Sequence, residues 1–205
     1  RSVIWLLVLP IPIAIVVSLL IGWFTLPSLI DGNVQKDAIA AAQQTVGQYK
    51  KIRGYYTKNV IKKVLADGNL KPSFNHASEA KGVPLPATFI HDMSALLKEE
   101  ATSLQLYSPY PFPNRQDRRL DSFQEDAWAY LVENPKGTFV RTEDVNGHAV
   151  VRVALADTMV AEACVKCHNS RADTPKADWS LGDVRGVLEV ATQIDAPLAR
   201  GAELS

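Results

Sequence analysis

Both cysteines of this chain lie within one pentapeptide, Cys164-Val165-Lys166-Cys167-His168. This spacing is the C-x-x-C-H pattern of covalent c-type haem attachment. In that chemistry the two thiols add across the vinyl groups of a haem, and the histidine that follows becomes the proximal ligand of the iron. We therefore expect one covalent haem c per chain, held by Cys164 and Cys167, with His168 as proximal iron ligand.

Two other interpretations of the pentapeptide remain open. A C-x-x-C pair can be a redox dithiol or a local disulfide, but a thioredoxin-type pair needs a βαβ setting, and this sequence does not indicate one. The two cysteines could also be half of a zinc site. Zinc would need two further ligands, and the remaining histidines are scattered along the chain at His76, His91 and His148.

The N-terminal segment is apolar enough to enter a membrane. The stretch 3–30 has no charged residue, and Trp5 and Trp23 lie near its two ends. A bilayer core needs about 20 apolar residues, and Trp favours the two interfaces. A cleaved signal peptide would have a shorter apolar core and a small-residue cleavage site, which we do not find. We therefore predict an uncleaved anchor at 1–30 in the bacterial inner membrane, with residues 31–205 in the periplasm.

Composition excludes some partners and bounds the size of the domain. The chain of 205 residues has 22 basic and 22 acidic residues. It has no polybasic run, so we do not expect it to bind nucleic acid. About 175 residues follow the anchor, enough for one domain with its own core. The chain begins at Arg1 rather than Met, and we expect it to be a fragment of a longer protein that carries an output domain elsewhere.

Apolar periodicity predicts one long helix directly after the anchor. Apolar residues recur at spacings of three and four along 31–67, and Gly68 follows as a stop signal. The predicted apolar face consists of Val34, Ala38, Ala41, Thr45, Tyr49, Ile52, Tyr56, Val60 and Val64. This face either covers the core of the domain or, in its half near the membrane, pairs with the same helix of a second subunit in a homodimer.

Two shorter helices should follow. The stretch 70–86 is predicted to be a loop because it contains four prolines and glycines that interrupt regular structure. A helix is expected at 87–104, and a third at 122–134, where Ser122 and Glu125 form a capping-box pattern. Between these helices, prolines at alternate positions exclude helix and central strand from 108–115.

The last third of the chain has the period of strands. We predict strands at 138–142, 148–156 and 184–194, with Asn146-Gly147 as a hairpin turn. Val151 and Val153 should share one face of the sheet. Helices followed by an antiparallel meander indicate an α+β fold. The haem motif falls in the connection between two strands, so the cofactor would lie at the edge of the sheet.

The chain also resembles a known family. The similar stretches are 52–60 (IRGYYTKNV), 86–89 (PATF), 108–115 (SPYPFPNR), 164–169 (CVKCHN), 178–179 (DW) and 182–187 (GDVRGV). They resemble the PAS-like c-type haem domains found on the extracytoplasmic side of bacterial sensor kinases, chemoreceptors and cyclases. The resemblance spans residues 35–197. It implies a PAS-like antiparallel sheet with flanking helices, a long helix running out of the membrane, and covalent haem.

The sixth iron ligand cannot be carried over from this resemblance. A described member of the family uses a third cysteine as distal ligand, and this chain has only two. Five alternatives stay open: His91, Met93, His76, His148, or an open position that a gas or redox ligand would occupy. Met93 would lie on the apolar face of its helix, where a methionine usually only fills space.

Two tyrosines and three arginines are further candidates for haem contacts. Tyr55 and Tyr56 would either pack on the ring and hydrogen-bond near it, or serve as ordinary core tyrosines. Arg115, Arg53 or Arg185 would pair with a propionate, because a guanidinium matches a carboxylate in a bidentate fashion.

These inferences define three functions. We expect a membrane-anchored extracytoplasmic haem c sensor module for redox or diatomic-gas signalling, embedded in the lipid bilayer and dimeric through its N-terminal helix. The alternative is a membrane-tethered c-type cytochrome for electron transfer. An enzymatic role is not expected, since no paired acid–base set occurs at a suggestive spacing.

Overall fold

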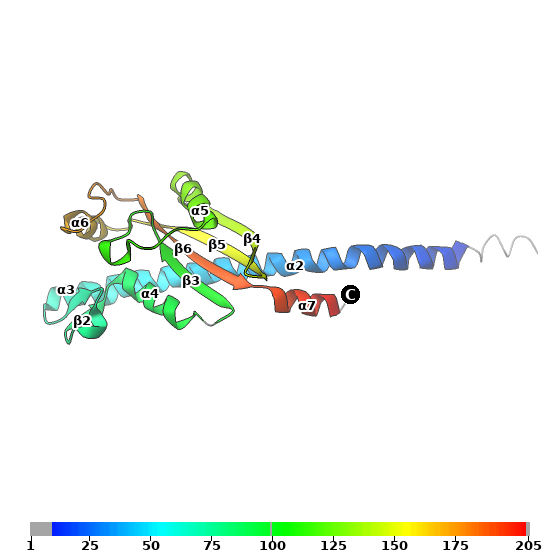
Figure 1. Cartoon of the computed structure of the whole chain (residues 1–205), viewed down its shortest axis with the longest axis horizontal. Coiled ribbons are helices and arrows are strands. Elements are labelled where there is room, and N and C mark those ends of the chain that lie inside the picture. Colours follow the sequence, from blue (N-terminus) through cyan, green and yellow to red (C-terminus); the bar gives the residue numbers. More distant parts are fainter. Residues whose placement is uncertain (1–9, 99, 204–205) are drawn as a thin grey trace, which may run out of the picture.

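The computed structural model describes residues 10–98 and 100–203 (Figure 1). The predictions for Trp5 and the rest of 1–9 lie outside these residues. A single long helical segment begins the described chain: α2 (Pro10–Tyr56) continues through a π-helical turn, η1 (Thr57–Ile61), into α3 (Lys62–Asp67). Gly68 then ends the helix with a φ of 76°, a left-handed conformation that suits glycine. The predicted helix end is thus confirmed, while the π-helical turn had no signal in the periodicity.

The first part of α2 projects beyond the rest of the molecule (Figure 1). From Ile11 onward the helix is long and apolar enough to cross a bilayer. Its apolar side chains are exposed, including Leu19, Trp23 and Phe24. The boundary at residue 31 between anchor and domain stays a prediction.

A four-stranded antiparallel sheet forms the centre of the domain. Its strands are β3 (Thr102–Tyr107), β4 (Thr138–Val145), β5 (His148–Thr158) and β6 (Val184–Gln193), in the spatial order β3-β6-β5-β4. Asn146 and Gly147 join β4 to β5 with φ angles of 56° and 82°. Two successive positive φ values are typical of a type I′ hairpin, as the Asn-Gly signal predicts. The mixed helix and sheet architecture confirms the α+β class, and the PAS-like character stays a prediction.

The remaining elements are short. A parallel pair of strands, β1 (Lys71–Ser73) and β2 (Gly82–Pro84), encloses the 3₁₀ turn η2 (His76–Ser78). The other helical elements are α4 (Pro86–Leu96), the 3₁₀ turn η3 (Pro113–Arg115), α5 (Ser122–Glu133), α6 (Glu162–Ser170) and α7 (Asp195–Glu203).

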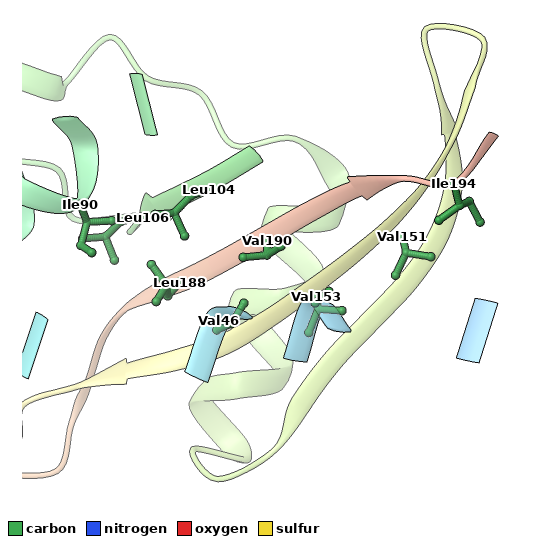
Figure 2. Close-up of a cluster of buried hydrophobic side chains, with 10 residues drawn as sticks. Val46, Ile90, Leu104, Leu106, Val151, Val153, Leu188, Val190 and Ile194 are labelled. Atoms are coloured by element: carbon green, nitrogen blue, oxygen red, sulfur yellow. The ribbon is translucent and has the colours of Figure 1, made fainter. Parts of the chain in front are cut away.

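Helices cover both faces of the sheet. On one face α2, α4 and α7 enclose the first apolar cluster, in which Val46 of α2 lies against the sheet (Figure 2). The buried members of this cluster are Ala42, Val46, Ile90, Leu104, Leu106, Val151, Val153, Leu188, Val190 and Ile194. On the other face, α5 packs through Phe123, Ala127 and Leu131 against a second cluster. The predicted shared face of Val151 and Val153 is confirmed.

Three predictions of local structure are wrong. The helix expected at 87–104 ends at Leu96, and Thr102–Tyr107 is strand β3, because Leu104 and Leu106 alternate with polar residues and face the first cluster. The loop expected at 70–86 contains β1, η2 and β2. The cap of α5 is formed by Asp121 and Gln124, one residue before the predicted pair, since the Asp121 carboxylate accepts from the Gln124 backbone N–H at 2.9 Å.

The predicted apolar face of the long helix is also partly wrong. Ala42 and Val46 are fully buried, whereas Ala41 is exposed and Ile52 is 49% exposed. The face that packs on the sheet is therefore rotated from the predicted one. It is also less apolar toward its end, where Arg53 lies at a half-buried position.

Candidate functional site

The C-x-x-C-H pentapeptide lies on α6, a helix inserted between the ends of two neighbouring strands. At the base of this insertion, the Met159 N–H donates to the Asp183 carbonyl at 2.8 Å and the Gly182 N–H donates to the Met159 carbonyl at 2.9 Å. These two bonds close the chain after β5 and before β6. The position between strands agrees with the sequence-based prediction, whereas the helical conformation of the pentapeptide was not predicted.

Helical geometry places the three motif residues on one side of α6. Cys164 and His168 are four residues apart, and Cys167 is three residues after Cys164, so all three are neighbours on the helix surface. Cys164 is half-buried and Cys167 is exposed, and both are free thiols. The dithiol interpretation therefore finds no disulfide in this structure, and both cysteines are free for thioether chemistry.

A side-chain clamp fixes the end of α6. The Asn169 amide donates to the Trp179 carbonyl at 2.9 Å and accepts from the Trp179 N–H at 3.0 Å. Trp179 is buried and packs edge-on against Tyr110 with ring centroids 5.6 Å apart. The residue next to His168 is thus held by a segment ten positions further along the chain, which restricts the orientation of the motif.

The imidazole of His168 lies between an arginine and an aromatic ring. The Arg185 Nε–H donates to His168 Nδ1 at 3.1 Å, and the Phe112 ring centroid lies 5.5 Å from that of the imidazole. Burial, together with the positive charge of Arg185, lowers the pKa of His168 to about 4. The imidazole is therefore neutral at physiological pH, which is the form that ligates a metal ion.

The Arg185 contact has a consequence for metal binding. An arginine only donates, so Nδ1 presents its lone pair to Arg185 and the proton of the neutral ring is on Nε2. A metal ion at Nδ1 would displace Arg185. A metal ion at Nε2 would leave the ring proton on Nδ1, which then has no lone pair for Arg185. Ligation by a neutral His168 thus requires Arg185 to leave this hydrogen bond.

Cations outnumber carboxylates around His168. Arg53 of α2 forms a bidentate pair with Asp157 at the end of β5, with Nη1 and Oδ2 2.9 Å apart. Arg171 lies over the Phe112 ring at 4.2 Å, and its charge and those of Arg53 and Arg185 all disfavour protonation of His168, whereas only Asp157 favours it. Arg53 is paired with Asp157 and Arg171 with Asp173, so in the described part of the chain Arg185 is left without a carboxylate partner, which favours an occupant that carries negative charge.

The residues at α6 therefore fit a haem. Two free thiols at the required spacing, a neutral imidazole, an aromatic ring and the guanidinium of Arg185 match the vinyl groups, iron, porphyrin face and a propionate of that group. The competing zinc interpretation has no such support: in residues 10–98 and 100–203 no three His, Cys, Asp or Glu side chains are grouped as a metal site.

The two tyrosines considered as haem contacts have different positions. Tyr55 is 68% exposed. Tyr56 donates to the Pro84 carbonyl at 2.8 Å and stacks on Phe89 with ring centroids 5.2 Å apart. Tyr56 thus attaches the long helix to β2 and α4, and its hydroxyl has a partner.

The candidates for the sixth iron ligand lie in different parts of the domain. Met93 packs against the first apolar cluster. His76 pairs with Asp92 at 3.0 Å, and His148 pairs with Asp195 at 3.1 Å. His91 lines a cavity between α4 and β3 together with Arg115, so the arginine proposed for a propionate and the proposed distal histidine occur together there.

Sequence reasoning missed Asp157 and Arg171 at the motif. Asp157 follows a predicted strand, and only its contact with Arg53 in the folded chain reveals a role. Arg171 follows the motif by three residues, so its proximity to the motif was available from the sequence alone.

Comparison with known proteins supports the same interpretation. A family model described as Tll0287-like matches residues 31–192, which is most of the chain. No curated protein is similar enough to match.

Proposed function

Because the chain belongs to the Tll0287-like family of cytochrome c-like sensor domains, we propose that it is a haem c sensor module for redox or diatomic-gas signals. In this proposal Cys164 and Cys167 hold the haem through thioether bonds, and His168 is the proximal ligand. When bound, the haem supplies an iron centre that accepts an electron or a diatomic ligand. The observation that carries the proposal is the C-x-x-C-H sequence on one helix face, where the imidazole is neutral and Arg185 lies beside it.

Each residue around the motif has a role in this proposal. His168 is kept neutral by burial and by nearby positive charge, so it needs no proton loss before it ligates iron. Arg185 leaves Nδ1 on ligation, which frees its guanidinium for a carboxylate. Phe112 packs against the imidazole in a tilted arrangement and supplies an apolar contact for the haem ring.

We further propose that the module is anchored in the inner membrane and faces the periplasm. The apolar start of α2 supports a membrane span, and the same helix carries Arg53 into contact with Asp157 beside the motif. One continuous helical segment thus connects the proposed bilayer span to the proposed haem site. A homodimer through this helix is supported by apolar side chains that remain exposed on it at Ile52, Tyr55 and Val60.

The test is spectroscopy of the full chain matured in an export-competent bacterial host. The expected results are a pyridine haemochrome band, a mass gain of one porphyrin, and a ferrous form that is high-spin and binds CO or NO. A haem that is six-coordinate and low-spin in both oxidation states, and that binds neither gas, would instead support electron transfer. Absence of both the band and the mass gain would disprove the proposal.

We propose no catalytic role for the module. Peroxidase turnover would require an acid–base group on the distal side of the iron. A steady-state assay with hydrogen peroxide should therefore give a background rate, and a saturable rate well above background would contradict this part of the proposal.

A further inference from the structure

A second basic region lies along one edge of the sheet, away from the motif helix. A cavity of about 390 Å³ opens between α4 and β3 and is closed on a third side by the segment that contains η3. This volume falls in the range of small-molecule sites. The lining residues are His91, Ser94, Ala95, Lys98, Ser103, Leu104, Gln105, Leu106, Arg115 and Arg118.

The floor of the cavity is the unpaired edge of the sheet. Within the described residues β3 pairs with β6 alone, so both the N–H and the C=O of alternate β3 residues point away from the sheet. The Leu106 carbonyl is one of these groups, because it accepts a hydrogen bond from Arg118 at 2.6 Å. By the alternation of the ladder, the N–H groups of Leu104 and Leu106 point the same way. The cavity therefore has backbone donors as well as cationic side chains.

Arg118 is held rigidly at this edge. Its second Nη donates to the Gln105 side-chain oxygen at 2.9 Å, and its guanidinium lies 5.5 Å from the centre of the Tyr107 ring. Such bonds fix the direction of a guanidinium before any ligand arrives, which reduces the ordering cost of binding.

Positive charge in the cavity is poorly balanced. In the described part of the chain, no carboxylate lies within salt-bridge distance of Arg115 or Arg118. Asp92 is near enough to influence Arg115, but its carboxylate is paired with His76. Glu189 and Asp121 influence Arg118, but both are paired with Arg152. Burial, and then repulsion from Arg118, lowers the pKa of Arg115. An anion in the cavity would relieve this repulsion.

We propose that this cavity binds the carboxylate of a small organic acid, with Arg115 and Arg118 as the anion-binding residues. The backbone donors of the β3 edge would complete the carboxylate site. Leu104, Leu106 and Ala95 supply an apolar wall, so the occupant has an apolar body as well as a charged end. An inorganic oxyanion would leave that wall without a partner.

A carboxylate of this kind could come from two sources. It could belong to a free organic acid, or it could be a propionate of the haem proposed for α6. Phe112 contacts the His168 ring, and Arg115 follows three residues later at the end of η3, so one short segment connects the two sites. None of the residues that line the cavity belongs to α6. The test below therefore includes a haem-free form.

The experiment is calorimetric titration of the detergent-solubilised full chain with hexanoate, with inorganic phosphate as a second probe. Two forms are compared: the haem-loaded chain, and a haem-free chain that carries Cys164→Ser and Cys167→Ser. A chain produced without haem maturation is a second haem-free form in case that variant misfolds. Since the haem-free arm needs no cofactor, it tests the cavity even if the proposed function fails.

Arg115→Gln should weaken hexanoate binding roughly tenfold or more, because a charge-assisted hydrogen-bonding partner is lost. Arg115→Lys keeps the charge but not the planar guanidinium. Its affinity for hexanoate should therefore lie between that of the unaltered chain and that of Arg115→Gln. The matched control is Arg119→Gln, an exposed arginine on the same segment whose side chain does not line the cavity, and it should change the affinity less than about twofold.

The pattern of binding identifies the source. Binding to both forms indicates a free organic acid. Binding only to the haem-free form, with a change in the propionate modes of the resonance Raman spectrum in Arg115→Gln, indicates a haem propionate. The inference is overturned if hexanoate binds neither form and Arg115→Gln leaves the Raman spectrum unchanged, or if Arg115→Gln and Arg119→Gln affect binding equally.

Discussion

His168 and His91 lie in two regions that use similar residues for different chemistry. Each imidazole is half-buried, each has arginines nearby, and each has a pKa lowered by burial first and by positive charge second, to about 4 for His168 and about 3 for His91. The two regions differ in what surrounds the ring. His168 has two thiols on its own helix and the Asp157 carboxylate nearby, whereas His91 shares an open cavity with Arg115.

The difference shows that a neutral histidine among arginines does not by itself identify a metal ligand. Burial and cations keep both rings neutral, so both would be able to ligate iron. Only the region of His168 also supplies groups that can form covalent bonds to a haem. The region of His91 supplies hydrogen-bond donors and an apolar wall, which suits recognition of an anion.

Removal of the thiols should give the largest effect. In Cys164→Ser with Cys167→Ser, we expect complete loss of covalent haem, because neither thioether bond can form. Pyridine haemochrome spectra and intact mass measure this loss. Arg115→Gln in the other region is the control and should retain one haem per chain; equal haem loss in both variants would show that the two regions are not separate.

Substitution of the two histidines should give the second largest difference, in the absorption spectra of the haem. His168→Ala should change the ferric and ferrous absorption spectra of the matured chain, because it removes the proximal ligand. His91→Ala should leave both spectra unchanged, since the described contacts of His91 belong to the cavity at β3. A spectral change in His91→Ala would make His91 the distal ligand and would contradict this separation.

The ion pair between α2 and β5 should make a measurable contribution to stability. Asp157→Asn removes a charge-assisted bidentate partner from Arg53, whose side chain is only 15% exposed. We expect the free energy of unfolding to fall by about 2 kcal/mol. Urea denaturation of the haem-free chain measures the change. Asp173→Asn, which removes the exposed partner of Arg171, is the control and should have a much smaller effect.

Acid titration should show that a different arginine lowers the pKa of each of the two histidines. Both pKa values lie below the ordinary value of 6.5, so as the pH falls below 6.5 the unfolded chain binds protons that the folded chain does not. The stability of the haem-free chain should therefore decrease from pH 6.5 toward pH 4. NMR of the imidazole protons should show that Arg185→Gln raises the pKa of His168 alone and that Arg115→Gln raises that of His91 alone. A shift of both pKa values in either variant would contradict this separation.

Much of the architecture follows from local patterns. The Asn146-Gly147 turn, the strands on either side of it and the position of the motif between two strands all depend on residues close together in the chain. β3 was missed because Leu96, Leu97 and Leu104 also fit a helical repeat, and only the alternation up to Tyr107 reveals a strand.

The candidate site was predictable only as far as its local motif. The pentapeptide identifies Cys164, Cys167 and His168, because one helix carries all three. The residues that shift the pKa of His168 include Arg53 of α2, Asp157 at the end of β5 and Arg185 at the start of β6. Arg53 is more than 100 residues away from the other two in the sequence. No spacing rule in the sequence links Arg53 to Asp157, so that part of the site required the folded structure.

Strand β6 begins with residues at the motif and ends at α7, which returns alongside α2. Arg185 is the second residue of β6, and Gly201 of α7 lies so close to Ile30 that an added Cβ would come within 2.4 Å of its side chain. A ten-residue strand spans about 33 Å and is stiff along its length. Strand β6 therefore connects Arg185, which ligation of His168 would displace, to the helix pair where the apolar part of α2 ends.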